Sequence, residues 1–251
     1  MATIEKTVVC LKWGNHPHTA EWVNRLYRGV ARHLSPPFRF VCFTDEPTGM
    51  EPAIESRNIQ SLTLGSELSG IWWKLAVMHP DAKLSGRCLF LDLDTVIVDN
   101  MDDFFSYPRR FYIIRNWIER RKQIFRARPQ VGNSSVFRFE TGTNSHVANL
   151  FLQNPAHANN RLIFPTEQAF ITHAIEKNNI TWRPESWVRS FKRHCLPIFP
   201  LNWLRRPQME AGTKIIAFHG GTPKLDKVIK GTVGNWYKRT LPMPQLAKHW
   251  K

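Results

Sequence analysis

Two aspartates interrupt an apolar stretch, residues 87–100, that reads RCLFLDLDTVIVDN. Residues i and i+2 of an extended segment point to the same side, so the carboxylates of Asp92 and Asp94 can converge on one ligand. Two adjacent carboxylates in a core are unfavourable unless a cation lies between them. Their hard oxygen atoms suit Mg²⁺ or Mn²⁺, so the spacing predicts a divalent metal site. The alternative is a strand that frays into an acidic surface turn.

A second polar group follows the last predicted strand, residues 214–218. His219 comes directly after this strand, and Gly221 and Lys224 come next. Imidazole binds metal ions, while exposed backbone N–H groups and an ammonium bind phosphate oxygens. This segment therefore suits a metal ligand beside a diphosphate.

Lys74 is the one cation in an apolar segment, residues 68–79, that we expect to be helical. A lysine there either extends its ammonium to solvent or places a positive charge near the metal and phosphates. Further along, Asn133 and Ser134 form a small polar turn that allows close backbone approach and hydrogen bonds to hydroxyls. Thr166 suits a helix N-cap with Glu167 in the first turn, which accounts for Glu167 but not for Gln168.

These residues must be positioned by alternating strands and helices. The apolar patterns predict strands at residues 5–13, 38–44, 88–91, 96–98, 111–114, 131–139 and 214–218, and helices at 19–34, 68–79, 144–153 and 166–176. The first strand, helix and second strand form a right-handed βαβ unit, so ligands are expected at the strands' carboxyl ends, near Lys12, Trp13 and Asp45. The predicted fold class is α/β, with a mixed, mostly parallel sheet flanked by helices. Residues 1–226 are expected to form one domain, and residues 227–251 a basic, aromatic C-terminal tail.

The composition is that of a globular protein. A chain of 251 residues with 42% apolar residues can bury a substantial core as one large domain. No apolar run approaches 18 residues, and the first residues lack the layout of a signal peptide, so a cytoplasmic location is expected. The four cysteines form no close pairs, and we expect them to be buried free thiols.

The net charge of +15 is concentrated in the second part of the chain. Residues 1–105 carry 10 basic and 13 acidic side chains, and the remainder carries 25 basic and 7 acidic ones. This asymmetry predicts an anionic partner: nucleic acid, anionic lipid head groups or a phosphorylated substrate. Basic side chains in residues 227–251 are interleaved with aromatic residues, a pattern that suits binding to a membrane interface or to single-stranded nucleic acid. A basic cluster is either a solvated helical face or a contact surface for lipid phosphates or an acidic acceptor; it comprises Arg120, Arg121, Lys122, Arg126 and Arg128.

With Asp92, Asp94 and His219 assembled, the chain resembles the nucleotide-sugar-dependent glycosyltransferases of the Rossmann-like GT-A fold. It is especially similar to the retaining family 8, the group of glycogenin and bacterial lipopolysaccharide galactosyltransferases. The resemblance runs over about residues 7–224 as a succession of short motifs. It implies that the three residues bind Mn²⁺ or Mg²⁺ and that Gly221 and Lys224 clamp the donor's diphosphate.

The same resemblance implies a donor site. Asp92 would also contact the ribose, Lys74 the donor sugar, and the Asn133-Ser134 turn would lie near that sugar. Glu167 and Gln168 look like the family's acidic-glutamine pair beside the reacting carbon, so they and Lys74 form the implied catalytic set. Lys12, Trp13 and Asp45 complete the expected donor-binding residues. The chain departs from the family pattern at Lys12-Trp13-Gly14, at Ser134-Ser135 and at Glu167.

The function implied is metal-dependent transfer of a hexosyl group from a nucleoside-diphosphate sugar, with UDP as the expected nucleotide. The acceptor would be an anionic saccharide or a glycolipid, as in surface polysaccharide or glycolipid synthesis. The resemblance implies retention of configuration, although the residues themselves leave retention and inversion open. Peripheral contact with the inner face of an anionic membrane is expected, and no nucleic acid partner.

Two other functions compete with this one. DLDTVIVD also resembles the nucleophile loop of Mg²⁺-dependent phosphatases of the haloacid dehalogenase type. Those enzymes need a further acidic pair, yet Asp226 is the only aspartate after Asp103. A basic nucleic-acid-binding protein would explain the charge, but it leaves the embedded aspartates and His219 without a role.

Overall fold

A computed structural model describes residues 5–14, 18–62, 64, 70–107, 110–117, 131–175, 180–182, 186–219, 224–231, 234, 236 and 239–251. Its strands are β1 (Lys6–Lys12), β2 (Arg39–Thr44), β3 (Glu55–Asn58), β4 (Arg87–Leu91), β5 (Thr95–Ile97), β6 (Phe111–Arg115), β7 (Gly132–Glu140), β8 (Thr181–Trp182), β9 (Val188–Ser190) and β10 (Ile215–Ala217). Its α-helices are α1 (Ala20–His33), α2 (Trp73–Ala76), α3 (Asp103–Ser106), α5 (Ser145–Gln153), α6 (Pro155–Ala158), α7 (Glu167–Ala174) and α8 (Leu225–Lys230).

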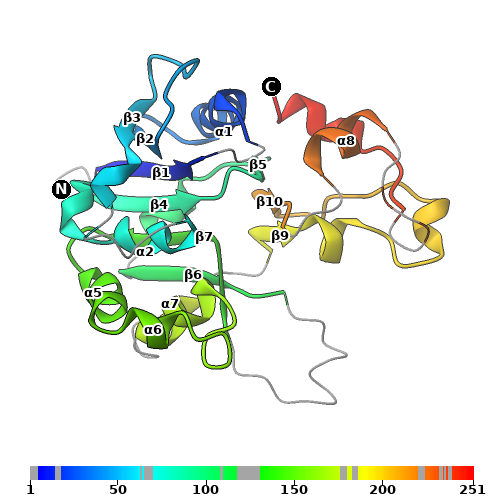
Figure 1. Ribbon diagram of the computed structural model, residues 1–251. Helices are drawn as coiled ribbons and strands as arrows, with labels where there is room; N and C mark the ends of the chain where they lie inside the picture. Colours follow the sequence, from blue (N-terminus) through cyan, green and yellow to red (C-terminus); the bar gives the residue numbers. More distant parts are fainter. Residues whose placement is uncertain are drawn as a thin grey trace.

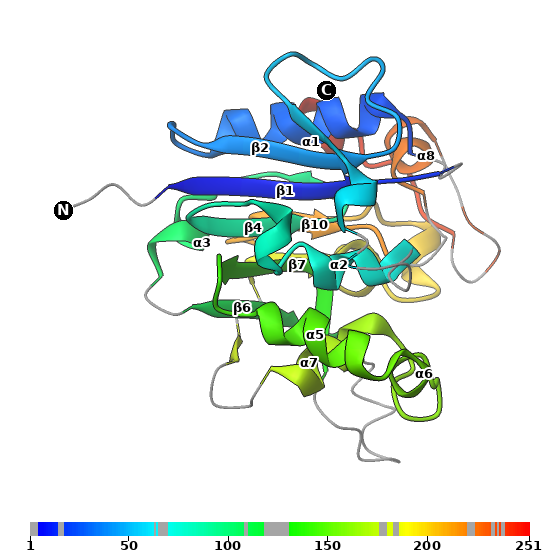
Figure 2. The same cartoon turned by 60° about the vertical axis from the view of Figure 1, so that its left-hand side comes forward.

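The main sheet has the strand order β3-β2-β1-β4-β7-β6-β8. The pairs β1–β2, β1–β4, β2–β3 and β6–β8 are parallel, whereas β7 runs antiparallel to both β4 and β6. Figure 2 shows β1 and its neighbours side by side. The predicted βαβ unit and the mixed, mostly parallel sheet are confirmed. The carboxyl ends of β1, β2 and β4 therefore meet at one edge, which is where such sheets bind ligands.

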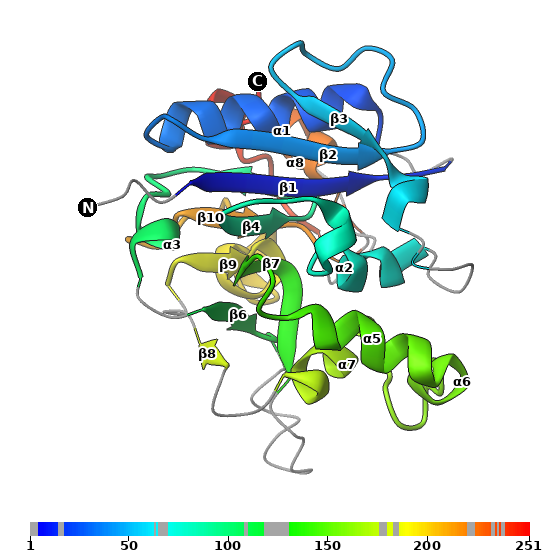
Figure 3. The ribbon, with the colours of Figure 1, turned by 90° about the vertical axis from the view of Figure 1, so that its left-hand side faces the viewer.

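Alternating residues of β1 enter two separate cores. Val8 and Cys10 pack with α1 on one face of the sheet. Val9 and Leu11 pack on the other face with α2, α5 and α7. Figures 1 and 3 show α1 and α5 on opposite sides of β1 and β4. All four cysteines are buried and free, as the sequence predicts.

The stretch 87–100 does not continue as one strand. β4 ends at Leu91, and β5 joins a second sheet with the order β5-β10-β9. The hydroxyl and the N–H of Thr95 donate to the Asp92 carbonyl at 2.7 and 3.2 Å, and these bonds turn the chain between the two sheets. Asp92 and Asp94 thus lie in a tight turn rather than in the extended segment expected. Buried Leu93 between them keeps both aspartates on the half-buried side.

Other predicted elements differ in length. Instead of a helix over residues 68–79, the described part of that segment holds the 3₁₀ turn Gly70–Trp72 followed by α2, which has only four residues. Residues 182–206, which show little periodicity, contain β9 and a π-helical turn, Phe191–Cys195. Thr166 does cap α7, because its side chain accepts a hydrogen bond from the Ala169 N–H. The basic cluster from Arg120 to Arg128 lies outside the described residues.

The C-terminal segment packs against α1 and the second sheet. Met243, Leu246 and Trp250 join a third core with the side chains of β5 and β10. The Trp250 ring meets Trp22 of α1 edge-on, with 5.2 Å between centroids. The expected boundary at residue 226 falls inside α8, and in the described part of the chain no helix is long and apolar enough to cross a bilayer.

Gly86, before β4, gives a test of this packing. It has φ +72°, and an added Cβ would lie 2.2 Å from the carbonyl oxygen of Glu5. Gly86→Ala is therefore expected to lower the free energy of unfolding by about 3 kcal/mol, because strain and a backbone clash combine. Gly142 has φ +78° but open space around it, so Gly142→Ala should cost only about 1 kcal/mol. Equal losses in urea denaturation would contradict the close approach of Glu5.

Candidate functional site

A polar cluster lies at the carboxyl edge of the main sheet. It joins Lys74 from α2, Asp92 after β4, Ser134 at the start of β7, and Glu167 and Gln168 from the first turn of α7. These residues are up to 94 positions apart in the sequence. They meet because β7 pairs with β4 and α7 packs on β7.

Lys74 is the centre of this cluster. Its Nζ lies 2.7 Å from Asp92 Oδ1 and 3.0 Å from Oδ2, and it is 3.8 Å from Glu167 Oε1. Only 6% of the residue is exposed, so the lysine does not reach solvent. Burial alone would lower the pKa of Lys74, but the charges of Asp92, Glu167 and Asp94 and the hydrogen bond to Asp92 raise it. Lys74 therefore stays a buried cation.

Ser134 connects β7 to α7. Its hydroxyl donates to Glu167 Oε1 at 2.8 Å, and its backbone N–H donates to Gln168 Oε1 at 3.3 Å. Asn133 Oδ1 accepts the N–H of Ser135 at 2.9 Å, while the Ser135 carbonyl accepts the Asp92 N–H. The helix start that carries Glu167 and Gln168 is thus tied to the aspartate turn through β7.

The environment of Asp94 changes the protonation of its carboxyl group. Burial, followed by the negative charge of Asp92, raises the pKa of Asp94 to about 7, although Lys74 opposes this shift. Lys74 thus offsets the charge of Asp92 more fully than that of Asp94. A second cation near Asp94 would restore its ionised form.

His219 lies next to this turn through the backbone. The N–H of Phe218, its neighbour, donates to the Asp94 carbonyl at 2.9 Å. The His219 Nε2 lies 2.6 Å from Ser190 Oγ, and its ring stacks on Trp117 with 4.8 Å between centroids. Burial, together with the charges of Lys192, Arg193 and His194, lowers the pKa of His219 to about 4. The imidazole is therefore neutral at pH 7, the form that binds metal ions.

The ends of β1 and β2 form the neighbouring part of the edge. Lys12 Nζ donates to the Glu46 carbonyl at 3.2 Å, and Asp45 Oδ2 accepts the Gly14 N–H at 2.6 Å. The Trp13 ring meets Trp73 of α2 edge-on at 5.6 Å. The two strand ends are thus linked to each other and to the helix that carries Lys74.

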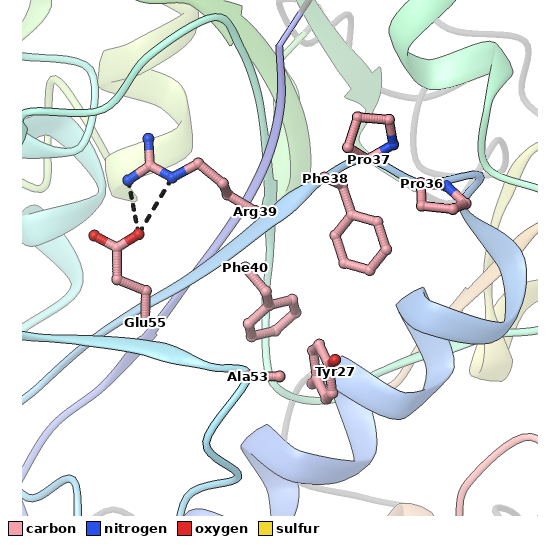
Figure 4. Close-up of a pocket in the computed structure, with 8 residues that line it drawn as sticks. All are labelled: Tyr27, Pro36, Pro37, Phe38, Arg39, Phe40, Ala53 and Glu55. Carbon is pink, nitrogen blue, oxygen red and sulfur yellow. Dashed lines mark hydrogen bonds and ion pairs between the residues drawn. The ribbon is translucent and has the colours of Figure 1, made fainter.

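A hollow of about 350 Å³ lies at the opposite end of the sheet. Figure 4 shows Phe38 and Phe40 beside Tyr27 of α1, with the Arg39–Glu55 ion pair near them. Phe38 and Phe40 lie at the start of β2 and Glu55 begins β3, whereas Asp92 follows the carboxyl end of β4. The hollow is therefore separate from the polar cluster.

The sequence matches no known protein-family profile and no curated protein. Solved structures do match. An active-site mutant of LgtC superposes with a TM-score of 0.57 and 10% identity over 96% of this chain and 94% of that chain. The galactosyltransferase LgtC in complex with donor and acceptor sugar analogs gives 0.52 and 11% over 85% and 87%. Mouse xyloside xylosyltransferase 1 gives 0.55 and 13% over 88% and 99%.

The chain has the GT-A fold of glycosyltransferases. At such low identity the likeness establishes the architecture, and the activity has to be argued from the site. In this GT-A chain the predicted residues Lys74, Asp92, Ser134, Glu167 and Gln168 come together in one cluster. Gly221 lies outside the described residues, and exposed Lys224 precedes α8 as its N-cap.

The metal ligands predicted for the GT-A chain do not converge on one point. Among the described residues, no three His, Cys, Asp or Glu side chains form a metal-binding group. Asp92 and Asp94 nevertheless fit a divalent cation. Both offer hard oxygen atoms, and Lys74 does not fully offset the negative charge of Asp94. His219 has Nε2 engaged by Ser190, which leaves Nδ1 as the nitrogen for an ion. The three-ligand set remains a prediction.

Sequence reasoning missed two partners of His219. Ser190 ends β9, a strand of three residues without a recognisable pattern, and Trp117 follows β6. Both reach His219 only through the second sheet and the end of β6. Ser190 stands between Arg189 and Phe191, and no local pattern in that segment indicates its contact with His219.

Proposed function

We propose that this protein is a metal-dependent glycosyltransferase that moves a hexosyl group from a UDP-sugar to a saccharide or glycolipid acceptor. The observation that carries the proposal is the buried cluster of Lys74, Asp92, Ser134 and Glu167 at the ligand-binding edge of a GT-A fold. A buried cation among several carboxylates suits a substrate that carries both phosphates and hydroxyls.

In this proposal Asp92 and Asp94, with His219, hold Mn²⁺ or Mg²⁺. When bound, the ion supplies positive charge that offsets the charge developing on the departing diphosphate. Gly221 and Lys224 contact that diphosphate. Lys12, Trp13 and Asp45 bind the nucleoside at the ends of β1 and β2.

Lys74, Asn133 and Ser134 orient the donor sugar. Lys74 keeps its proton and presents its ammonium to sugar oxygens, while Glu167 and Gln168 lie beside the reacting carbon. Retention requires either a nucleophile or attack on the same face as departure. Because an amide is a poor nucleophile, we assign Gln168 a positioning role and propose attack on the same face.

The one aspartate after Asp103 does not supply the acidic pair that the phosphatase alternative needs. Asp226, the single later aspartate, pairs with Arg25 Nη1 at 3.2 Å and accepts the Trp250 indole N–H at 3.2 Å. These contacts join α8 to α1 and the C-terminal segment. Asp226 therefore has a structural role away from Asp92.

Calorimetric titration with UDP and with GDP, each with and without Mn²⁺, tests the proposal. We expect UDP to bind at least tenfold more tightly in the presence of Mn²⁺, because an ion held by Asp92 and Asp94 would supply positive charge to the diphosphate. Comparing the affinities for UDP and GDP shows whether the proposed contacts at Lys12, Trp13 and Asp45 distinguish uracil from guanine. Failure of both nucleotides to bind with Mn²⁺ present would overturn the proposed donor site.

A further inference from the structure

Large apolar side chains are exposed on the segment that follows the π-helical turn and at Trp236, which follows α8. Ile198 is 76% exposed, Leu204 82% and Trp236 62%. Solvent-exposed apolar residues are usually scattered singly, and a continuous group marks an interaction surface. We call this group the Trp236 patch; it comprises Ile198, Phe199, Leu201, Trp203, Leu204 and Trp236.

The Trp236 patch is held in place by its own contacts. Phe199 stacks on Trp236 with 5.0 Å between centroids, and the Trp203 indole N–H donates to the Trp236 carbonyl at 2.9 Å. Below them Asn202 is 1% exposed, and its Nδ2 donates to the Arg239 carbonyl at 2.6 Å. The exposed rings are therefore already ordered, so binding through them loses little conformational entropy.

Basic side chains border the patch. Arg205 and Arg206 are exposed directly after Leu204, and the Arg239 guanidinium lies 4.7 Å from the centre of the Trp203 ring. Tryptophan and aliphatic side chains flanked by arginines suit the boundary between lipid head groups and acyl chains. The excess of basic residues after residue 105 favours an anionic bilayer.

A second copy of the chain fits this surface less well. A two-fold dimer through the patch would bring Arg205 and Arg206 of one copy close to the same arginines of the other. Like charges across an interface oppose association. Anionic lipid head groups instead complement them.

The segment that carries most of the patch lies toward the same end of the main sheet as the candidate site. In Figures 1 and 2 the yellow segment around β9 lies toward the end of the sheet to which the β1 arrow points. Asp92 follows β4, which is parallel to β1, and therefore lies at the same end. We propose that the Trp236 patch is a membrane-contact surface, which inserts its apolar side chains into an anionic bilayer while Arg205 and Arg206 pair with lipid phosphates.

Vesicle co-sedimentation of the full chain tests this surface without any sugar donor, so its outcome is independent of the proposed reaction. We compare phosphatidylcholine vesicles with vesicles that contain about a third phosphatidylglycerol. Ile198→Glu/Leu204→Glu should lower the partition coefficient onto the anionic vesicles about tenfold or more. Arg205→Gln/Arg206→Gln should reduce the preference for anionic vesicles about fivefold per arginine.

The matched control is Leu162→Glu/Ile163→Glu. It adds the same charge at two residues that follow α6 in the sequence and are 95% and 46% exposed. Figure 1 shows α6 apart from the yellow segment. An equal loss of binding in this control, or no binding by the unchanged protein, would overturn the proposal. A dimer in sedimentation velocity that Ile198→Glu/Leu204→Glu dissociates would overturn it in favour of a contact between copies.

A second measurement locates the contact. Because the native cysteines are buried, a polarity-sensitive dye can be attached at Leu204→Cys or, as the control, at Leu162→Cys. Anionic vesicles should shift the emission of the dye to the blue at residue 204 and leave it unchanged at residue 162. The opposite pattern would place the membrane contact elsewhere.

Discussion

Lys74→Met is expected to lower the free energy of unfolding of the metal-free protein by about 3–5 kcal/mol, because it removes one partner of a buried ion pair. The Nζ atom lies 2.7 and 3.0 Å from the two Asp92 carboxylate oxygens, and the Lys74 side chain is 7% exposed. Without it, the carboxylates of Asp92, Asp94 and Glu167 would face one another with no cation between them. Turnover should fall at least a hundredfold, since the donor sugar loses its charged contact.

Two further variants distinguish the loss of the Lys74–Asp92 ion pair from a general effect of replacing a lysine on the free energy of unfolding. Lys74→Met/Asp92→Asn should recover part of the lost stability, because the charge left unpaired by the first change is removed by the second. Lys248→Met, at an exposed position, should change stability by less than about 0.5 kcal/mol. Urea denaturation that shows Lys74→Met to be as stable as the unchanged protein would contradict the buried pair.

Asp94→Asn is expected to stabilise the metal-free protein above pH 7. The folded state keeps the Asp94 proton up to a pKa of about 7, whereas an unperturbed aspartate ionises near 3.8. Between these values the folded state binds more protons than the unfolded state, so its stability falls as pH rises. An asparagine carries no such penalty and should gain of the order of 2 kcal/mol at pH 8, a difference that shrinks towards pH 4.

Mn²⁺ should reverse this order. A bound ion would offset the negative charge of Asp94 and so stabilise the unchanged protein at pH 8. Asp94→Asn lacks one of the carboxylates that would hold the ion, so it should gain less stability. Thermal unfolding at pH 5 and pH 8, with and without Mn²⁺, measures both effects, with exposed Asp99→Asn as the control. Identical pH dependence in the unchanged protein and Asp94→Asn would show that Asp94 is not a buried, destabilising carboxylate.

The sequence was most informative where a pattern is local and repeated. The apolar run of β1 and the periodicity of α1 predicted the βαβ unit, and Thr166 predicted the start of α7. β9 was not predicted, because three residues carry no period and the strand exists only by pairing with β10. Tertiary contacts also shortened the helix expected around Lys74, a segment whose apolar residues fill a core without a continuous helix.

Several residues of the candidate site could also be predicted from the sequence. Residue types and resemblance selected Lys74, Asp92, Ser134, Glu167 and Gln168, which the fold brings together. The turn at Asp92 was not visible in the sequence, because it depends on bonds from Thr95 and on the change of β5 to another sheet. Ser190 and Trp117 were missed because their contact with His219 joins segments that no local pattern connects.

In the proposed reaction, transfer from a nucleotide-activated sugar depends on the metal ion that Asp92 and Asp94 would hold. Release of UDP from a panel of UDP-sugars, measured with and without Mn²⁺ for the unchanged protein and for Asp94→Asn, tests it most directly. We expect Mn²⁺-dependent release from at least one donor and a loss of at least about a hundredfold in Asp94→Asn, with the fold intact. Normal Mn²⁺-dependent release by Asp94→Asn would contradict a metal-holding role of Asp94.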